Sequence, residues 1–490
     1  MSRLVLAVAL VLAPALALAD LGPMPGEERF KGLVPDDKQH VGMDAGFGRI
    51  EEDYFVQLTL KTELNLGPVG LGLQVPLNLR VWDKAPKATG DYYGLIRHED
   101  WQRPSDYIKV IRYLRLGHKR DEFYLRVGEL AATLGHGTIM NRYLNNVDVN
   151  AFRAGSEFDI NTDYGGFETV ISDFGTIYDT KNPDSRIFAL RTYVRPVALA
   201  DPSSLANIFA LGFSVVTDTN APLAIAQSDA VVDEFGNQTA PSRPIVEDGR
   251  LKVATAKAAT VYGFDVEAEV LHSAILDIVP YSDLNFIQGA GSGWHLGVLV
   301  TAKMPIGFDL TIPVRLEYRR LKANYLPAYF STFYEIERYA EIDRANNAST
   351  QPDPKATYVR GLSGPGLNGY YGDLAFDFAG IFQVGAVYED YVTTDPKIGP
   401  NIQAFLAVPA LETIQFKAFY ARTNIQGTND ILKFDERSMA VAQARYEVYT
   451  YVYLVGRMSR RWVLATAGPA VGTYKATDDW KFGLEIDVSF

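Results

Sequence analysis

The segment Trp480-Lys481-Phe482-Gly483-Leu484-Glu485-Ile486-Asp487-Val488-Ser489-Phe490 alternates without interruption between apolar and polar residues. Successive side chains of a β-strand point to opposite faces of the sheet, so this segment has one apolar face and one polar face. The polar face carries full charges. The segment therefore predicts a strand that separates an apolar medium from water.

The same alternation recurs throughout the chain, for example at 71–81, 262–270, 309–319 and 414–420. Each stretch is about as long as a tilted membrane-spanning strand, roughly 9–11 residues. Beyond the first 19 residues no run of 18 apolar residues occurs, which excludes a transmembrane helix there. A membrane protein built from strands must close its sheet, because open sheet edges cannot face lipid.

The fold class predicted is therefore all-β, a single transmembrane antiparallel β-barrel. One segment, 437–461, is long enough for two strands, and single-chain barrels normally have an even number of strands. We expect about 18 strands, within a range of 16–20. The predicted strands are 43–50, 54–64, 70–82, 106–117, 122–131, 151–160, 166–174, 186–196, 207–217, 257–270, 274–284, 293–304, 308–320, 370–378, 381–391, 401–410, 413–423, 437–461 and 479–490.

The connections between these strands alternate between tight and long. Long connections lie near 83–105, 132–150, 218–256, 321–369 and 424–436. Barrels of this kind have short periplasmic turns and long extracellular loops, so the alternation predicts the orientation. The predicted domains are an N-terminal tail in the periplasm at 20–40 and the barrel at 41–490.

The first residues have the pattern of a secretory signal peptide. Arg3 precedes an apolar run from Leu4 to Leu18, and Ala17-Leu18-Ala19 fits the small-residue cleavage site. We expect residues 1–19 to be removed on export.

With its closing strand and aromatic last residue, the chain resembles Gram-negative outer-membrane β-barrel proteins of the porin type. The resemblance implies location in the outer membrane, contact with its lipid, and an assembly signal that the barrel-assembly machinery recognises. The signal residues would be Trp480, Phe482 and Phe490. In size and architecture the chain is also similar to the large single-chain barrels that export polysaccharide, which implies a periplasmic export partner at 20–40.

Composition supports this class and excludes others. The formal net charge is −12, which argues against nucleic-acid binding. Cysteine is absent, so disulfides, thiolate metal sites and thiol nucleophiles are excluded. The chain has 28 tyrosines, 26 phenylalanines and 41 glycines, a mixture that suits aromatic girdles and tight turns.

Charges on the predicted inward faces are expected to line the lumen. They either brace the wall as ion pairs or set up a transverse field that selects solutes, and both roles are compatible. The predicted lumen-lining residues are Arg112, Arg115, Arg191, Arg195, Asp265, Glu267, Glu269, Arg315, Glu317, Arg319, Asp373, Asp377, Lys417, Arg445 and Glu447.

An aromatic segment within the long loop 321–350 is a candidate solute-contact site. Thr332 and Glu335 fit a capping box, which predicts a short helix. The loop either packs on itself outside the barrel or folds into the mouth and offers rings and carboxylates to a sugar-like solute. Its candidate contact residues are Tyr325, Tyr329, Phe330, Phe333, Tyr334 and Glu335.

The segment 133–143 contains Gly135 and Gly137, which permit a tight bend. The favoured interpretation is an outer turn or strand end at the barrel rim. The other is a constriction inside the barrel, with His136 and Arg142 as its candidate residues and Arg142 in contact with solute.

Motifs for other chemistry fail in their context. The pattern G-x-G-x-x-G at 364–369 precedes a strand and opens no helix, so a dinucleotide site is not indicated. Asp159, Asn161 and Asp163 resemble the start of a calcium loop, but Val170 stands at its twelfth position. We expect no cofactor, no metal and no enzymatic activity.

The function predicted is an outer-membrane channel for hydrophilic solutes, exported polysaccharide among them. One alternative is a plugged barrel that serves as adhesin, receptor or scaffold. A membrane-embedded hydrolase is another, less favoured because no nucleophile motif accompanies the six histidines.

Overall fold

The computed structural model describes residues 39–50, 53–83, 95–97, 100–101, 104–119, 121–146, 152–178, 184–201, 204–229, 231–232, 235, 238–240, 244–247, 250–305, 307–339, 353–379, 381–392, 399–408, 413–464 and 474–489. The predicted signal peptide 1–19, nearly all of the predicted tail 20–40 and Phe490 lie outside these residues. Those predictions therefore stay predictions.

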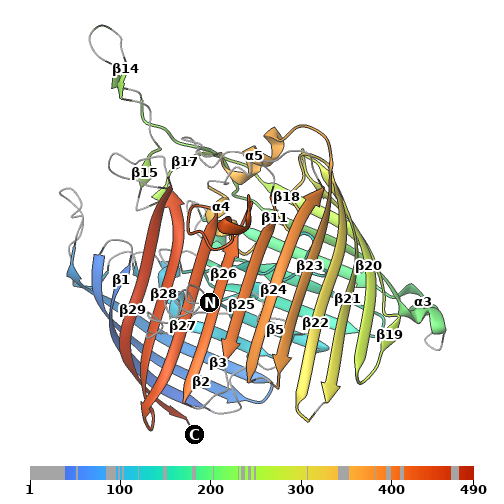
Figure 1. The fold of residues 1–490 in the computed structure, drawn as a ribbon, viewed down its shortest axis with the longest axis horizontal. Coiled ribbons are helices and arrows are strands. Elements are labelled where there is room, and N and C mark those ends of the chain that lie inside the picture. The colour runs from blue at the N-terminus through green and yellow to red at the C-terminus, as the bar shows by residue number, and fades with distance from the viewer. Residues whose placement is uncertain are drawn as a thin grey trace.

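The described chain forms one antiparallel sheet that closes on itself (Figure 1). Each strand pairs with its neighbour in sequence, and the first strand pairs with the last. The strands of the sheet are β1 (His40–Ile50), β2 (Asp53–Leu66), β3 (Val69–Trp82), β4 (Ile111–Leu116), β5 (Phe123–Gly128), β8 (Gly155–Thr162), β9 (Gly165–Ile171), β10 (Ile187–Val194), β11 (Phe209–Asp218), β18 (Ala259–Ala268), β19 (Leu271–His272), β20 (Leu276–Ile287), β21 (Ser292–Pro305), β22 (Asp309–Leu321), β23 (Leu367–Phe378), β24 (Phe382–Val392), β25 (Asn401–Val408), β26 (Ile414–Arg422), β27 (Ser438–Tyr449), β28 (Val452–Leu464) and β29 (Tyr474–Ser489).

The closed barrel has 20 strands, because β18 and β19 both pair with β20 and act as one interrupted strand. The predicted fold class is confirmed, and the number of strands lies at the upper end of the expected range. Every predicted segment overlaps a barrel strand, and 437–461 covers β27 and most of β28. Residues 106–110, predicted as the start of the strand 106–117, instead belong to the 3₁₀ helix η3 (Pro104–Val110).

The seam between β1 and β29 runs over the quoted C-terminal segment. Phe47 pairs with Phe482, and Arg49 pairs with Trp480. The rings of Phe47 and Trp480 lie 5.8 Å apart on the outward face, and Phe482 is 45% exposed there. The apolar alternate positions of the last strand therefore face outward, as the pattern predicts.

The two faces of the barrel differ in chemistry. Large exposed apolar side chains such as Leu60, Leu211, Phe264, Leu316 and Leu484 are the outward members of their strands. Inward members of the same strands include buried charged residues. A sheet with this distribution is stable only with hydrocarbon outside and polar partners or water inside.

Long connections gather at one edge of the barrel, here called the loop edge, and most short turns at the other, the turn edge (Figure 1). The loop edge carries α2 (Gly175–Tyr178), α4 (Tyr334–Glu337), α5 (Lys355–Gly361), η5 (Thr428–Asp430) and the small hairpins β6 (Ala131–Ala132) with β7 (Tyr143–Leu144), β12 (Pro222–Ile225) with β17 (Val253–Ala256), β13 (Val231–Val232) with β14 (Gln238–Ala240), and β15 (Val246–Glu247) with β16 (Arg250–Leu251). One longer connection at the turn edge holds α3 (Pro196–Ala200) and η4 (Leu205–Ile208). None of the helices in the described part of the chain is long and apolar enough to cross a membrane.

Candidate functional site

Two connections from the loop edge, residues 129–146 and 322–339, fold into the barrel and are called the inner loops. They join through their backbones: Ala328 donates to the carbonyl of Thr138 at 2.9 Å, and Asn141 donates to that of Phe330 at 3.1 Å. A parallel bridge links Met140 and Phe330. Segments almost 200 residues apart in the chain thus form one small unit.

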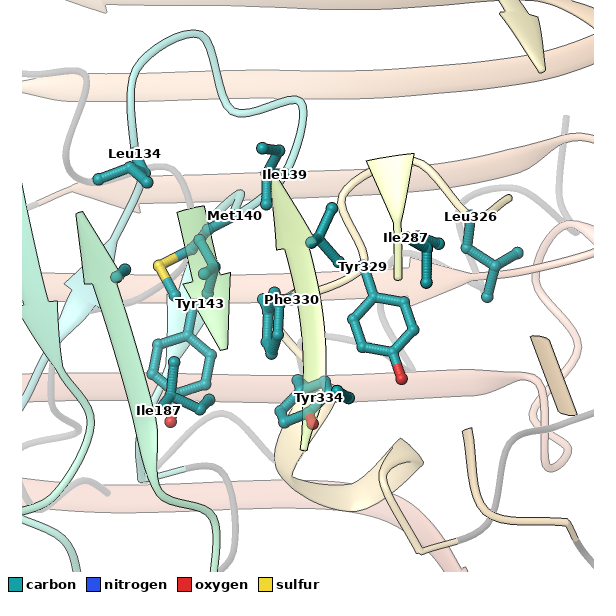
Figure 2. Close-up of a cluster of buried hydrophobic side chains, with 14 of the residues drawn as sticks. Leu134, Ile139, Met140, Tyr143, Ile187, Ile287, Leu326, Tyr329, Phe330 and Tyr334 are labelled. Atoms are coloured by element: carbon teal, nitrogen blue, oxygen red, sulfur yellow. The ribbon is translucent and has the colours of Figure 1, made fainter. Parts of the chain in front are cut away.

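Figure 2 shows the apolar cluster that holds this unit in place. Tyr143, Phe330 and Tyr334 from the inner loops are completely buried. They belong to the same cluster as Ile187 of β10 and Ile287 of β20, which face inward. Burial of each large apolar side chain stabilises by about 1.5–3 kcal/mol. The inner loops are therefore packed against the wall formed by β9–β11, β18 and β20.

His136 fastens the first inner loop to that wall. Its Nδ1 lies 2.9 Å from Asp283 and its Nε2 lies 2.7 Å from Glu267. Burial alone would lower the pKa of His136, but the carboxylates of Asp283 and Glu267 raise it to about 10. The imidazole is therefore a cation between two carboxylates, and Thr138 adds a hydrogen bond to Asp283 at 2.6 Å.

Two further buried ion pairs hold the inner loops. The Arg142 guanidinium donates to Asp373 of β23 at 2.8 Å. Arg338, directly after α4, pairs with Asp218 of β11 at 3.1 Å. Removing one member of such a pair leaves an uncompensated buried charge, so both pairs resist release of the loops.

The predicted helix in the second inner loop exists as α4, but the predicted capping box does not form. The helix begins after Phe333, whose side chain makes no cap hydrogen bond. Glu335 instead accepts hydrogen bonds from Tyr143 and Ser185 at 2.5 Å. Hydrogen bonds to residues distant in the chain therefore take the place of the predicted local capping hydrogen bond.

The aromatic solute-contact prediction needs correction. Only Phe333 is half-buried, and its ring lies 6.2 Å from that of Phe419 on β26. The other candidates are 3% exposed or less and have no surface to offer a solute: Tyr325, Tyr329, Phe330, Tyr334 and Glu335. The apolar cluster and buried polar contacts occupy their side chains.

The favoured rim position of segment 133–143 is also wrong. His136 and Arg142 lie inside the barrel, as the constriction interpretation has it, but they are 6% and 2% exposed. Their contacts are the wall carboxylates, so Arg142 does not face solute in this structure.

The predicted lumen-lining charges fall into three groups by position. Behind the inner loops, ion pairs and hydrogen bonds occupy Arg191, Asp265, Glu267, Arg315, Glu317, Arg319 and Asp373. On the opposite wall and next to it, inward positions are held by Arg115, Asp377, Lys417, Arg445 and Glu447. Arg112 lies at a β-bulge of β4 and pairs with Glu63 of β2.

Arg195 and Glu269 form the third group and need correction. β10 ends at Val194 and β18 at Ala268, so both residues lie past the strand ends at the turn edge. Glu269 has a side chain that is 44% exposed and pairs with His272 at 3.2 Å. The sequence extends both strands too far.

The wall opposite the inner loops keeps partly exposed polar side chains. Half-buried inward positions there include Lys417, Gln443, Arg457 and Gln74. Lys61 is 13% and Arg445 16% exposed, whereas Arg315 and Arg319 behind the inner loops are 2% and 1% exposed. Among the described residues, the inner loops therefore fill one side of the lumen and leave the opposite wall more exposed.

A cavity of about 190 Å³ lies where the second inner loop faces this open side. Its lining combines Phe333, Glu337 and Lys355 with the wall residues Gln403 and Arg461. Such a lining is polar, carries both signs of charge and includes an aromatic ring. It suits a small hydrophilic solute better than an apolar one.

One group in the described chain has the spacing of a metal site. Ligand atoms of His136, Asp265 and Glu267 lie within 4.8 Å of one another. The Arg191 guanidinium donates to both carboxylates, at 2.8 and 3.3 Å. A cation already balances this cluster, so its residues fit an ion-pair network and not a divalent ion.

Several residues that shape the site escaped the sequence prediction. Tyr281 and His295 lie at inward positions of their strands. The alternation of side chains along each strand was enough to predict that position. Arg338 and Arg153 give no local signal, because their buried partners are distant in the chain.

No protein-family model matches the chain, and no curated protein matches it. Among solved structures it is similar to OccAB2 of Acinetobacter baumannii, with 8% identity over 94% of this chain and 100% of that one and a TM-score of 0.31. It is also similar to OpdK of Pseudomonas aeruginosa with vanillate, with 10% identity over 93% of this chain and 99% of that one and a TM-score of 0.33. The ferric enterobactin receptor PfeA in complex with BCV-L6 is similar as well, with 7% identity over 92% of this chain and 81% of that one and a TM-score of 0.32.

Structural similarity with such low identities and TM-scores gives no information about a transported solute. The closed sheet, its apolar outer face and its charged inner face make the architecture that of a Gram-negative outer-membrane β-barrel.

Proposed function

We propose that the protein is an outer-membrane channel for small hydrophilic solutes, with the path along the open side of the lumen between β25–β29 and β1–β3. The observation that carries the proposal is the contrast between the two walls. Both walls hold ion pairs, but they differ in exposure: the side chains of Arg315 and Arg319 behind the inner loops are 2% and 1% exposed, whereas those of Lys61 and Arg445 on the open side, which pair with Glu485, are 13% and 16% exposed. The exposed part of these charged side chains is most stable in contact with water.

Charge along the path would set its selectivity. Cations lie on four of its neighbouring strands, at Lys417, Arg445, Arg457 and Lys481. Asp44, Glu485 and Asp487 lie beside them, and Lys481 donates to Asp44 at 2.7 Å. Fixed charges of both signs lower the barrier for polar solutes and order their dipoles.

Passage of a polymer has no support in this geometry. The inner loops occupy one side of the lumen, and buried pairs such as Arg142–Asp373 and Arg338–Asp218 hold them there. The expected polysaccharide export, and the periplasmic partner that it implied, therefore have nothing to rest on. We propose small solutes instead.

The loop edge would face outward and the turn edge the periplasm, because long loops are extracellular in barrels of this kind. In that orientation the inner loops enter from the outside. Cleavage after residue 19 and recognition of Trp480, Phe482 and Phe490 by the assembly machinery remain part of the proposal.

A plugged barrel is the second candidate function. It is favoured by the apolar cluster inside the lumen, which is unusual for a water-filled channel and gives the inner loops a dry core. A hydrolase is less favoured: the buried histidines His136 and His295 pair with carboxylates and contact tyrosine rings.

Single-channel recording in planar bilayers separates the first two functions. We expect discrete current steps from the purified protein. Gln443→Trp places a large ring on the open side and should reduce the conductance by about half or more. The matched control is Ala442→Trp, one residue earlier on β27 and on the outward face, which should leave conductance unchanged. An absence of steps, or equal effects of the two variants, would refute the channel.

A further inference from the structure

A groove on the outside of the barrel, at the loop edge, is not used by the proposed channel. It has a volume of about 580 Å³ and lies over β20, β21 and β22 and the segment 362–366. Its lining includes Leu284, Trp294, Arg320 and Lys322. Leu284, Trp294 and Arg320 alternate with the inward residues Asp283, His295 and Arg319, so they point away from the lumen.

The groove has two chemically distinct halves. One part is apolar and aromatic: Leu284 is 43% exposed, and the Trp294 ring lies 6.2 Å from that of Tyr318. Tyr318 in turn lies 5.7 Å from Tyr370. Aromatic rings of this kind mark the boundary between hydrocarbon and headgroups. The other part carries the exposed cations Arg320 and Lys322.

Neither cation is neutralised by a carboxylate in the described part of the chain. No carboxylate of the described residues forms an ion pair with Arg320 or Lys322. The outward acid on the nearby strand β24, Asp390, instead accepts a hydrogen bond from Tyr388 at 2.9 Å. On another part of the outward face at the loop edge, Arg460 is bound by Asp478 through two contacts of 2.5 and 2.7 Å. The outward Arg460 thus has a carboxylate partner, whereas the outward Arg320 is available to a ligand from the surroundings.

We infer that this groove binds the phosphate-bearing headgroup of a lipid A molecule in the outer leaflet, with Arg320 and Lys322 on the phosphate and the acyl chains along Trp294 and Leu284. An exposed guanidinium and an ammonium are the side chains that bind phosphate best. Their place beside aromatic side chains, with Arg320 directly across from Trp294 in the sheet, matches a lipid, in which phosphate and hydrocarbon are joined. The inference rests on the proposed outer-membrane channel with its loop edge outward.

Native mass spectrometry of the full-length protein in detergent tests the inference. The probes are lipid A with both phosphates, phosphatidylcholine and inorganic phosphate, each at the same concentration. We expect the wild type to retain one lipid A, and the double variant Arg320→Gln/Lys322→Gln to retain about tenfold less. The control Arg460→Gln should retain lipid A like the wild type, because Asp478 already occupies that arginine.

Three outcomes overturn the inference: equal retention by the double variant, equal retention of phosphatidylcholine, and displacement of lipid A by inorganic phosphate. The last would show a free-anion site instead of a lipid site. Bilayer recording keeps this test separate from that of the channel. If the wild type conducts but retains no lipid A, only the lipid inference fails; if it retains lipid A without conducting, only the channel fails.

Discussion

The imidazole ring of His136 stacks on the phenol ring of Tyr281, with 4.0 Å between the ring centroids and 12° between the ring planes. One ring belongs to an inner loop and the other to strand β20. With Asp283 and Glu267 at its two nitrogens, His136 touches the wall on three sides. This single side chain therefore couples the position of the constriction to the protonation of one imidazole.

Stability should fall at alkaline pH because of His136. Its pKa is raised from an unfolded value of about 6.5 to about 10. A raised pKa contributes stability that is complete below the unfolded value and is lost as pH rises through the folded one. We expect a loss on the order of 3–5 kcal/mol between pH 7 and pH 10.5. The measurement is the unfolding midpoint in denaturant, followed by gel mobility.

His136→Gln is the control for that experiment. The variant should be less stable than the wild type at pH 7, and its midpoint should change less between pH 7 and pH 10.5. Parallel pH profiles for the two proteins would assign the alkaline loss to lysines and tyrosines instead.

Arg142→Ala should destabilise the barrel by about 3–5 kcal/mol, because it leaves Asp373 buried without its cation. Arg142 also has a positive φ of 52°, so its backbone is held in an unfavourable conformation. The double variant Arg142→Met/Asp373→Leu should recover much of the loss, since no buried charge remains. In bilayers the single variant should show noisier current. If the single and double variants were equally unstable, the Arg142–Asp373 ion pair would not be what holds the inner loop to β23.

The fold could be predicted from the sequence because its signal is local. Each strand carries its own alternation, as in 309–319, and needs no knowledge of the rest of the chain. The interior could not be predicted in the same way. Tyr143 donates to Glu335, 192 residues away, and no pattern near either residue reveals that contact. The aromatic run around Phe330 is visible in the sequence, but a ring in an apolar core and a ring that contacts a solute give the same sequence signal.

Phe330 and Phe333 should therefore respond differently to truncation. Phe330 is completely buried in the apolar cluster, so Phe330→Ala should cost about 3–5 kcal/mol. Phe333 faces the cavity and is half-buried, so Phe333→Ala should cost about 1 kcal/mol. Chemical unfolding of the two variants compares them directly. Equal losses would show that both rings belong to the core.

Charge reversal on the open side should change ion selectivity. Lys417 and Arg457 face inward on β26 and β28, with Gln443 between them in register. We expect Lys417→Glu and Arg457→Glu each to move the reversal potential toward that of the cation in a tenfold gradient of KCl, because a fixed anion attracts cations into the path. Lys322→Glu, on the outward side, is the matched control. A shift of the same size in the control would place the selective charge outside the lumen.

Closure of the barrel should depend on the glycines of its seam. A Cβ added at Gly48 of β1 would lie 2.2 Å from the backbone oxygen of Trp480 and 2.9 Å from the Cα of Lys481. Such a contact can be relieved only by moving the strands apart, so Gly48→Val should reduce the folded fraction severalfold. Gly372 of β23 is the control, because its added Cβ would meet only Leu316, at 3.8 Å. The heat-modifiable band on a gel measures the folded fraction. If Gly372→Val were as damaging as Gly48→Val, strand propensity would be the cause, and the close approach at the seam would not.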